Sequence, residues 1–337
     1  MPRSPHSLPS CHRAPPPHPA HSTSPPTSPS WPRWPAPPSA STPAPAPPPQ
    51  RTARSAAPSY GRRTNPGPPA RSTPRPPVLV PDEVRLRRRI LAAAHRRPRA
   101  EGTDFLTPDE RAAVDRASEP RLIPRPGPIP LLPIAQLYAR DIPEAVAFPA
   151  PPGADLLQLL WCPFDHAGRA GPTPRTELRW RTTADISEPL APAPHPSAIG
   201  KDRYLPEPCV LHPEPVTEYP APHELPEPLA DRVEDWAESH GVGYQYDLAV
   251  APGCKLGGHA PWSYTDPFPM ACTECGAPVR PLLTIDGYEC DGGTRSWWPG
   301  EATESARPTH LNIGRDHALQ LYVCTTSYDH PHQRNIQ

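Results

Sequence analysis

Apolar residues recur at helical spacing in three stretches of the chain. The first spans residues 82–97, where acidic residues occupy the first turn and arginines the last, as the helix dipole favours. The second begins at Thr107 and ends near Ala117, because Thr107-Pro-Asp-Glu110 is a capping box with proline at the first helical position. The third spans residues 226–239, with its apolar side chains on one face and Gly241 as a C-terminal cap. The pattern therefore predicts three short helices.

Four short runs predict β-strands. Residues 154–161 form an apolar run after a Pro-Pro-Gly turn, which indicates a buried strand, and residues 177–181 alternate between apolar and polar. Residues 279–285 and 318–323 complete the set. The prolines between positions 120 and 133 forbid a regular helix and favour an extended segment laid on a core. Together these elements predict an α+β fold with mostly antiparallel short strands and a few helices.

The first 80 residues differ in composition from the rest. They hold 26 of the 63 prolines, nine arginines and no acidic residue, which gives a net charge of +9. The remainder has 25 basic and 35 acidic residues, a net charge of −10. Because the few large apolar side chains cannot offset the entropy of ordering 80 residues, we expect a long disordered Pro-rich N-terminal tail over 1–80. A helical lead-in over 81–119 and one α+β domain over 120–337 should follow it.

The tail also has a second interpretation. The chain uses 32 arginines and only two lysines, which is typical of GC-rich coding DNA. A GC-rich leader translated from a misassigned start would have the same composition, so a true start at Val78, Val80 or Val84 is an alternative. If translated, the tail is either a solvated segment or one that binds a partner, and nucleic acid is the less favoured partner.

Compartment and membrane association follow from what the sequence lacks. No run of about 18 apolar residues could form a transmembrane helix, and the N-terminus has no apolar core of a secretory signal. We therefore expect a cytoplasmic protein without membrane association, in which the cysteines are reduced thiols.

A pair of cysteines, Cys272 and Cys275, is separated by two residues and followed by glycine. This spacing is typical of a knuckle that turns two thiolates toward one metal ion. Cys324 and His330 are the best source of the second pair that a closed, structural zinc site needs. Alternative fourth ligands are His332, Cys290 and Cys254. Buried thiols without a metal, and redox use of the CxxC pair, also remain open.

Two further motifs have weaker chemical interpretations. Cys162 and His166 lie four residues apart without an orienting third group, which favours a buried cysteine over a nucleophile and its base. The Lys255-Leu-Gly-Gly258 turn lacks the following helix that a phosphate-binding loop requires. Trp297-Trp298 predicts either an exposed interaction surface or a local core under a long loop.

Several short motifs follow one another in order over residues 120–337. They are Pro133-Ile-Ala-Gln136-Leu, Leu156-Leu-Gln-Leu-Leu160, Lys255-Leu-Gly-Gly258, Leu282-Leu-Thr-Ile-Asp286 and Asp291-Gly-Gly293. Their order resembles the YwqG-like bacterial family, a domain of unknown function. The resemblance implies an α+β fold rich in antiparallel strands, a cytoplasmic location and no established catalytic residue. The chain departs from the family at Cys254, where members often have a histidine or an aromatic residue.

No positioned acid–base pair, nucleophile elbow or cofactor fingerprint stands out in the sequence. We therefore expect an uncharacterised bacterial YwqG-like domain that acts as a non-enzymatic protein-binding module with a structural zinc site. The alternative is a metal-dependent hydrolase-like enzyme that uses the Cys/His cluster. An open three-ligand site beside a carboxylate would favour the enzyme, whereas a closed four-ligand site would not.

Overall fold

The structure is a computed structural model. It describes residues 77–123, 129–144, 146–167, 172–186, 195–290, 293–298 and 307–337. The chain divides into two units, Met1–Gly67 and Pro68–Gln337. The first unit lies outside the described residues, and so does the expected disorder of residues 1–76.

The helices expected from the sequence are present. They are α1 (Pro81–Arg96), α2 (Pro108–Ser118) and α3 (Glu227–Ser239). The capping box of α2 is confirmed, because the Glu110 amide donates to Thr107 Oγ1 at 3.2 Å and the Thr107 amide donates to Glu110 Oε2 at 2.9 Å. Gly241, which follows α3, has a φ of +68°, a left-handed conformation that glycine adopts without strain.

The strands form two antiparallel sheets. The first has the order β1 (Leu132–Tyr138), β2 (Leu156–His166) and β3 (Thr173–Arg181). The second has the order β4 (Lys255–Leu256), β5 (Val279–Ile285), β6 (Leu319–Cys324) and β7 (Gln333–Ile336). The predicted α+β class with short antiparallel strands is thus confirmed, while β1, β4 and β7 are strands that the alternation pattern did not predict.

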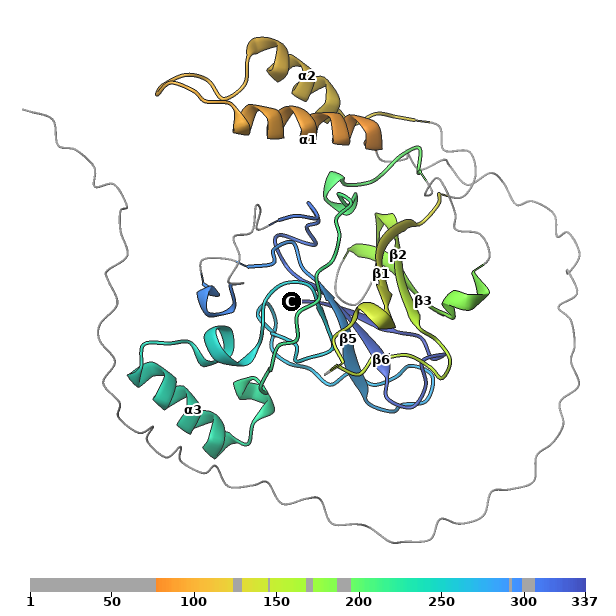
Figure 1. Cartoon of the computed structure of the whole chain (residues 1–337), viewed down its shortest axis with the longest axis vertical. Helices are drawn as coiled ribbons and strands as arrows, with labels where there is room; N and C mark the ends of the chain where they lie inside the picture. The colour runs from red at the N-terminus through yellow and green to blue at the C-terminus, as the bar shows by residue number, and fades with distance from the viewer. Residues whose placement is uncertain are drawn as a thin grey trace, which may run out of the picture. The chain divides into compact units, whose positions relative to one another are not determined.

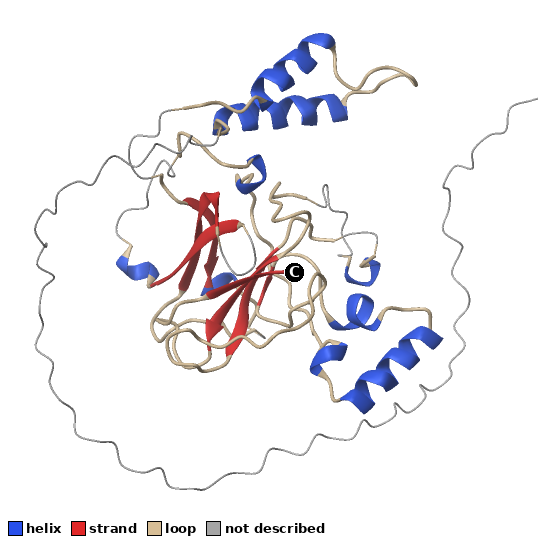
Figure 2. Ribbon diagram, turned by 180° about the vertical axis from the view of Figure 1, so that it is seen from behind, coloured by secondary structure: helices blue, strands red, loops and turns tan. Residues whose placement is uncertain are grey.

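Both sheets contribute to one hydrophobic core, and Figures 1 and 2 show them side by side. Leu157, Leu159 and Trp161 on β2 pack in the same cluster as Leu319 and Leu321 on β6. The indole N–H of the fully buried Trp161 donates to the carbonyl of Tyr204 at 2.9 Å, which satisfies its one polar group. The two sheets thus share one core.

The fold begins slightly earlier than the composition boundary at residue 80 indicates. Val78 pairs with Arg121 and Leu79 with Ile199 through isolated β-bridges, and Val78 is buried. Val84 on α1 is fully buried in the main cluster. The segment expected as a lead-in therefore contributes to the same core as the two sheets.

One expected burial is wrong. The apolar spacing in α3 predicts a face turned to the core, yet Trp236 is 51% exposed. Its ring stacks on that of His240, with the ring centroids 4.2 Å apart. Only Ala237 of α3 is buried, and the helix lies at the periphery against η4 (Pro222–Glu224) and η5 (Tyr244–Ala249) (Figure 1). The periodicity identified the helix correctly but not what covers its apolar face.

Candidate metal centre

The four residues that the sequence assigned to a metal site lie together. Cys272 and Cys275 are in the turn before β5, Cys324 is the last residue of β6, and His330 is in the loop between β6 and β7. Antiparallel pairing of β5 with β6 sets Val279 opposite Cys324, which brings the two cysteine-bearing segments to one end of the sheet. One donor atom from each residue lies within 4.8 Å of every other.

The CxxC turn is built as the sequence predicts. Gly276 has a φ of +72°, and its amide donates to the carbonyl of Cys272 at 2.9 Å. The amide of Cys272 donates to the carbonyl of Ala277 at 2.7 Å, which closes the turn. The left-handed conformation explains why glycine follows the second cysteine, since a side chain there would be strained.

The donor atoms approach one another closely. Cys275 Sγ lies 3.6 Å from Cys324 Sγ, and His330 Nδ1 lies 3.4 Å from Cys324 Sγ and 3.5 Å from Cys272 Sγ. The hydroxyl of Thr326 lies 2.9 Å from Cys324 Sγ and 3.4 Å from Cys275 Sγ. Three sulfur donors and one imidazole nitrogen therefore surround one small volume.

The surroundings favour thiolate at two of the cysteines. The Thr326 hydroxyl is the main cause that lowers the pKa of Cys324 to about 5, and it also lowers the pKa of Cys275. Burial raises the pKa of Cys272, whereas the hydrogen bond with Cys324 raises the pKa of His330. The thiolate is the form that binds metal ions, so Cys275 and Cys324 are prepared for binding, whereas Cys272 and His330 would lose a proton when an ion binds.

Backbone groups that follow each of the two buried cysteines favour its thiolate. The backbone of Glu274 and Cys275, two and three residues onward, lowers the pKa of Cys272 against the larger effect of burial. The amide of Thr326 donates to the sulfur of Cys324 at 3.4 Å, and the backbone of Ser327 also lowers the pKa of Cys324. Cys324-Thr-Thr-Ser327 thus has the spacing of a CxxC pair with serine at the second position, and His330 is the fourth donor of the group. This CxxS spacing is a sequence signal for the second half of the group.

The alternative fourth ligands lie elsewhere. His332 contacts Thr176 Oγ1 through Nε2 at 2.7 Å, and burial lowers its pKa to about 4. Cys254 contacts the backbone of Asp286, and burial raises its pKa. Neither residue, nor Cys290, belongs to the group of donors that lie together. His330 is thus the candidate that lies with the three cysteines.

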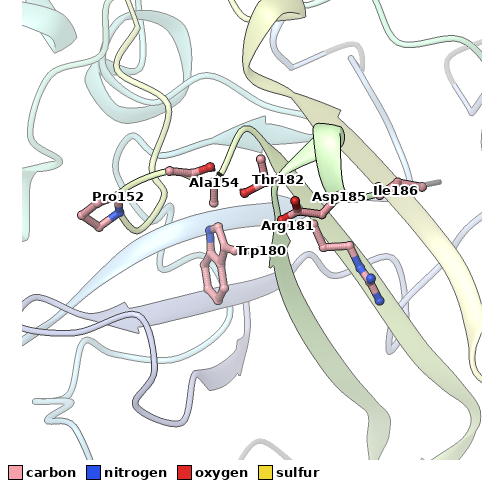
Figure 3. Close-up of a pocket in the computed structure, with 8 residues that line it drawn as sticks. Pro152, Ala154, Trp180, Arg181, Thr182, Asp185 and Ile186 are labelled. Atoms are coloured by element: carbon pink, nitrogen blue, oxygen red, sulfur yellow. Dashed lines mark hydrogen bonds between the residues drawn. The ribbon is translucent and has the colours of Figure 1, made fainter.

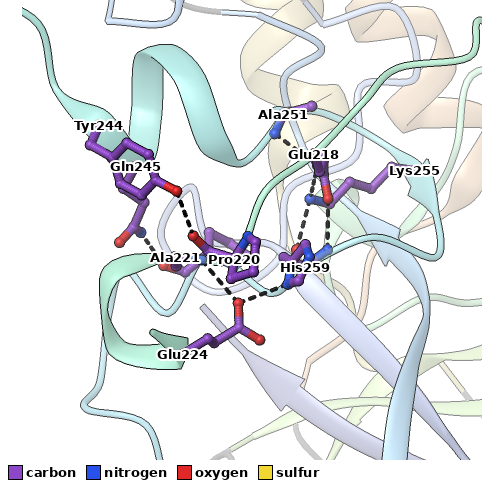
Figure 4. Close-up of polar contacts among 10 residues, drawn as sticks. Glu218, Pro220, Ala221, Glu224, Tyr244, Gln245, Ala251, Lys255 and His259 are labelled. Carbon is purple, nitrogen blue, oxygen red and sulfur yellow. Dashed lines mark hydrogen bonds and ion pairs between the residues drawn. The ribbon is translucent and has the colours of Figure 1, made fainter. Parts of the chain in front are cut away.

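The Lys255-Leu-Gly-Gly258 turn holds a buried carboxylate of the chain itself (Figure 4). Glu218 accepts hydrogen bonds from the amide of His259 at 2.6 Å, the amide of Ala251 at 2.8 Å and Lys255 Nζ at 2.5 Å. The side chains of Glu218 and Lys255 are only 6% and 11% exposed. The donors that a phosphate would need are thus already used by Glu218.

The same network extends toward α3. Glu224 on η4 accepts hydrogen bonds from the amide of Ala221 at 3.0 Å and from His259 Nδ1 at 2.8 Å (Figure 4). Burial lowers the pKa of Lys255, and the attraction of Glu218 opposes this shift. The contacts join the segment before η4 to β4, so we assign the network a structural role.

A shallow hollow of about 310 Å³ lies beside the end of β3 (Figure 3). Trp180, Arg181 and Asp185 are among its lining residues. The indole of Trp180 already donates to the carbonyl of Pro149 at 3.0 Å, and Arg181 Nε donates to Gln158 at 2.9 Å. Because these donors are satisfied within the chain, we assign the hollow no ligand.

The other sequence motifs show no catalytic arrangement within the described residues. Among the described residues no hydrogen bond joins Cys162 to His166, and His166 Nε2 is buried without a partner. Trp298 is 51% exposed, which agrees with an interaction surface, while the indole of Trp297 donates to the carbonyl of Tyr246 at 2.8 Å.

Comparison with family models, curated proteins and solved structures finds no match for this chain. The resemblance to the YwqG-like family therefore rests on motif order alone. Within the part of the chain that the structure describes, no helix is both long enough and apolar enough to cross a membrane.

Proposed function

We propose that the chain is a non-enzymatic protein-binding module whose fold is stabilised by a structural zinc ion held by Cys272, Cys275, Cys324 and His330. The observation that carries the metal assignment is the mutual approach of these four donors, all within 4.8 Å. Three thiolates and one imidazole are a donor set that selects zinc among common divalent ions, and zinc favours tetrahedral coordination. The reduced thiols that the site needs agree with the cytoplasmic location expected from the sequence.

A closed site supports a structural role over a catalytic one. Four protein donors complete a tetrahedral shell, so no position is left for a reactive water. The group contains no carboxylate that could act as a base on such a water. The ion would join the turn before β5 to the end of β6 and to the loop that leads into β7. The hydrolase-like alternative requires an open position that this donor set does not provide.

The protein-binding part of the proposal is supported by α3. The helix carries five acidic residues and one arginine, and none of the five forms an ion pair with another described residue. Asp231 and Asp235, and likewise Glu234 and Glu238, are like charges at i,i+4, which destabilise a helix. Its last turn carries acids and no base, which the helix dipole disfavours.

Exposed aromatic side chains accompany this charge. α3 contacts η5, and η5 contacts η6 (Arg295–Trp297). Trp236 on α3, Tyr246 on η5 and Trp298 after η6 are each about half exposed. A helix that carries destabilising like-charge pairs and an exposed tryptophan is typical of a binding surface, where function rather than stability determines the residues. The matching partner is a basic protein segment, with arginines that pair with the carboxylates and stack on Trp236.

Metal content tests the zinc site. We expect one zinc ion per chain in full-length protein purified without a histidine tag, and its loss in Cys272→Ser together with a lower unfolding temperature. Cys290→Ser is the matched control, since Cys290 is also buried but lies outside the donor group. Equal zinc content in wild type and Cys272→Ser would contradict the assignment.

Titration with an arginine-rich peptide tests the binding surface. We expect neutralisation of four acids in α3 to weaken binding by about tenfold or more at about 0.1 M salt. The substitutions are Asp231→Asn, Glu234→Gln, Asp235→Asn and Glu238→Gln. The control neutralises four exposed acids in and beside α2, Glu101, Asp109, Asp115 and Glu119, and changes the net charge equally. Equal weakening in both variants would show that only net charge matters.

Arginine and lysine peptides separate stacking from charge. Trp236 should favour the arginine peptide, because a guanidinium stacks on an indole better than an ammonium does. Trp236→Ala should remove this preference and leave the remaining affinity equal for both peptides. An unchanged preference in Trp236→Ala would exclude Trp236 from the surface.

A further inference from the structure

Two of the three sulfur atoms at the metal centre differ in exposure but lie close together. Cys275 is exposed, whereas Cys272 and Cys324 are buried. Cys275 Sγ lies 3.6 Å from Cys324 Sγ, and the Thr326 hydroxyl contacts both. A disulfide bond of about 2.05 Å requires an approach of roughly 1.5 Å, within the reach of a side-chain rotation.

We propose that Cys275 and Cys324 form a disulfide bond when hydrogen peroxide attacks the site, and that the bond replaces the metal ion as the covalent tie between the turn before β5 and the end of β6. The release of zinc rests on the function proposed above, whereas the choice of the disulfide pair rests on the geometry of the sulfurs alone.

The step balances in atoms and electrons. The exposed Cys275 thiolate attacks one peroxide oxygen, which breaks the O–O bond, forms a sulfenic acid and releases hydroxide. The Cys324 thiolate then attacks the Cys275 sulfur, forms the S–S bond and expels a second hydroxide. Two solvent protons convert both hydroxides to water. Two thiolates lose two electrons and the peroxide gains two, and the metal leaves as an aqueous dication because two of its ligands are gone.

The position of the pair explains why the fold would tolerate this exchange. Cys275 lies just before β5, and Cys324 is the last residue of β6. Next to Cys324, the amide of Thr325 donates to the carbonyl of Pro278, which precedes β5, at 3.1 Å. The two segments are thus already hydrogen-bonded to each other. The disulfide would fix an existing contact, whereas Cys272 and His330 would lose their tie to the centre.

The test uses the full chain loaded with one equivalent of zinc and treated with peroxide. We expect zinc release, measured with a metallochromic dye, in a one-to-one ratio with a Cys275–Cys324 disulfide identified by peptide mapping under non-reducing conditions. A thiol reductant with added zinc should reverse both changes. Cys272→Ser should still form the disulfide, because it retains both partners.

The outcomes separate this proposal from the zinc assignment. A chain that binds no zinc but forms the Cys275–Cys324 disulfide would contradict the zinc site and leave the disulfide supported. A zinc-bearing chain that yields a Cys272–Cys275 disulfide, or only sulfinic acid at Cys275, would overturn the disulfide proposal. Zinc release without any disulfide would overturn it as well.

Discussion

The carboxylate of Glu218 occupies the space beside Gly258 that a side chain at that position would need. A Cβ at Gly258 would overlap Glu218 Oε2, and the φ of Gly258 is +74°. The glycine is therefore required for two reasons, the left-handed backbone and the approach of a buried acid. This relationship, rather than phosphate binding, explains the Lys255-Leu-Gly-Gly258 motif.

A methyl group at Gly258 should disrupt this network. We expect Gly258→Ala to lower the free energy of unfolding by about 3 kcal/mol or more, because it adds backbone strain and displaces a buried ion pair. Gly257→Ala is the control, since Gly257 has a similar φ of +73° but open space around its Cβ. It should cost about 1–2 kcal/mol. Denaturant unfolding of both variants measures the difference, and equal losses would contradict the role of Glu218.

Glu110 should make stability depend on acidic pH. The hydrogen bond with Arg97, followed by those with Thr107, lowers the pKa of Glu110 to about 2. A carboxyl whose pKa is lower in the folded chain stabilises it above its ordinary pKa of 4.5 and loses that effect as the pH falls toward 2. Glu110→Gln should therefore be less stable than wild type at pH 7, and the gap should narrow between pH 4.5 and 2. A gap that stays constant would be inconsistent with this linkage.

Neutralising the acids of α3 should stabilise the chain. The four substitutions at positions 231, 234, 235 and 238 remove like-charge pairs worth about 0.2–0.5 kcal/mol each. We expect the unfolding temperature to rise by a few degrees at low salt and the gain to shrink as salt is added. Thermal unfolding at two ionic strengths checks this, and a lower unfolding temperature would mean that these acids support the fold rather than a partner.

Thr326 should tune metal affinity. Its hydroxyl contacts the sulfurs of Cys324 and Cys275, so Thr326→Val should weaken zinc binding by about 10–100-fold without removing a ligand. Thr325→Val is the matched control, because the Thr325 hydroxyl donates to the carbonyl of Pro278 instead. Competition with a chelator of known affinity measures both. Equal zinc affinity in the two variants would exclude this role of the hydroxyl.

The grouping of Cys272, Cys275, Cys324 and His330 was largely predictable from sequence, because residues close together in the chain carry each half of it. The CxxC spacing with a following glycine specifies a turn, and Cys324 and His330 lie close together in the chain. The two halves meet because β5 pairs with β6. The apolar runs at residues 279–285 and 318–323 predict these two strands, and the structure shows their pairing.

The Glu218 network was not predictable in the same way. Glu218 lies in a proline-rich segment without periodicity, 37 residues from Lys255, and only tertiary packing brings them together. The apolar pattern did not predict β7, because this strand is four residues long and carries polar side chains, one of which, Asn335, is buried. The exposure of Trp236 shows that a helical apolar stripe does not reveal whether a core or a partner covers it.

The most direct test of the zinc proposal is X-ray absorption at the zinc edge of the full-length protein. We expect a shell of three sulfurs at about 2.3 Å and one nitrogen at about 2.0 Å, with no oxygen ligand. That result would establish a closed site built from Cys272, Cys275, Cys324 and His330 and support a structural role. A shell with two sulfurs or fewer, or with an oxygen at a ligand position, would contradict the closed site and favour the hydrolase-like alternative.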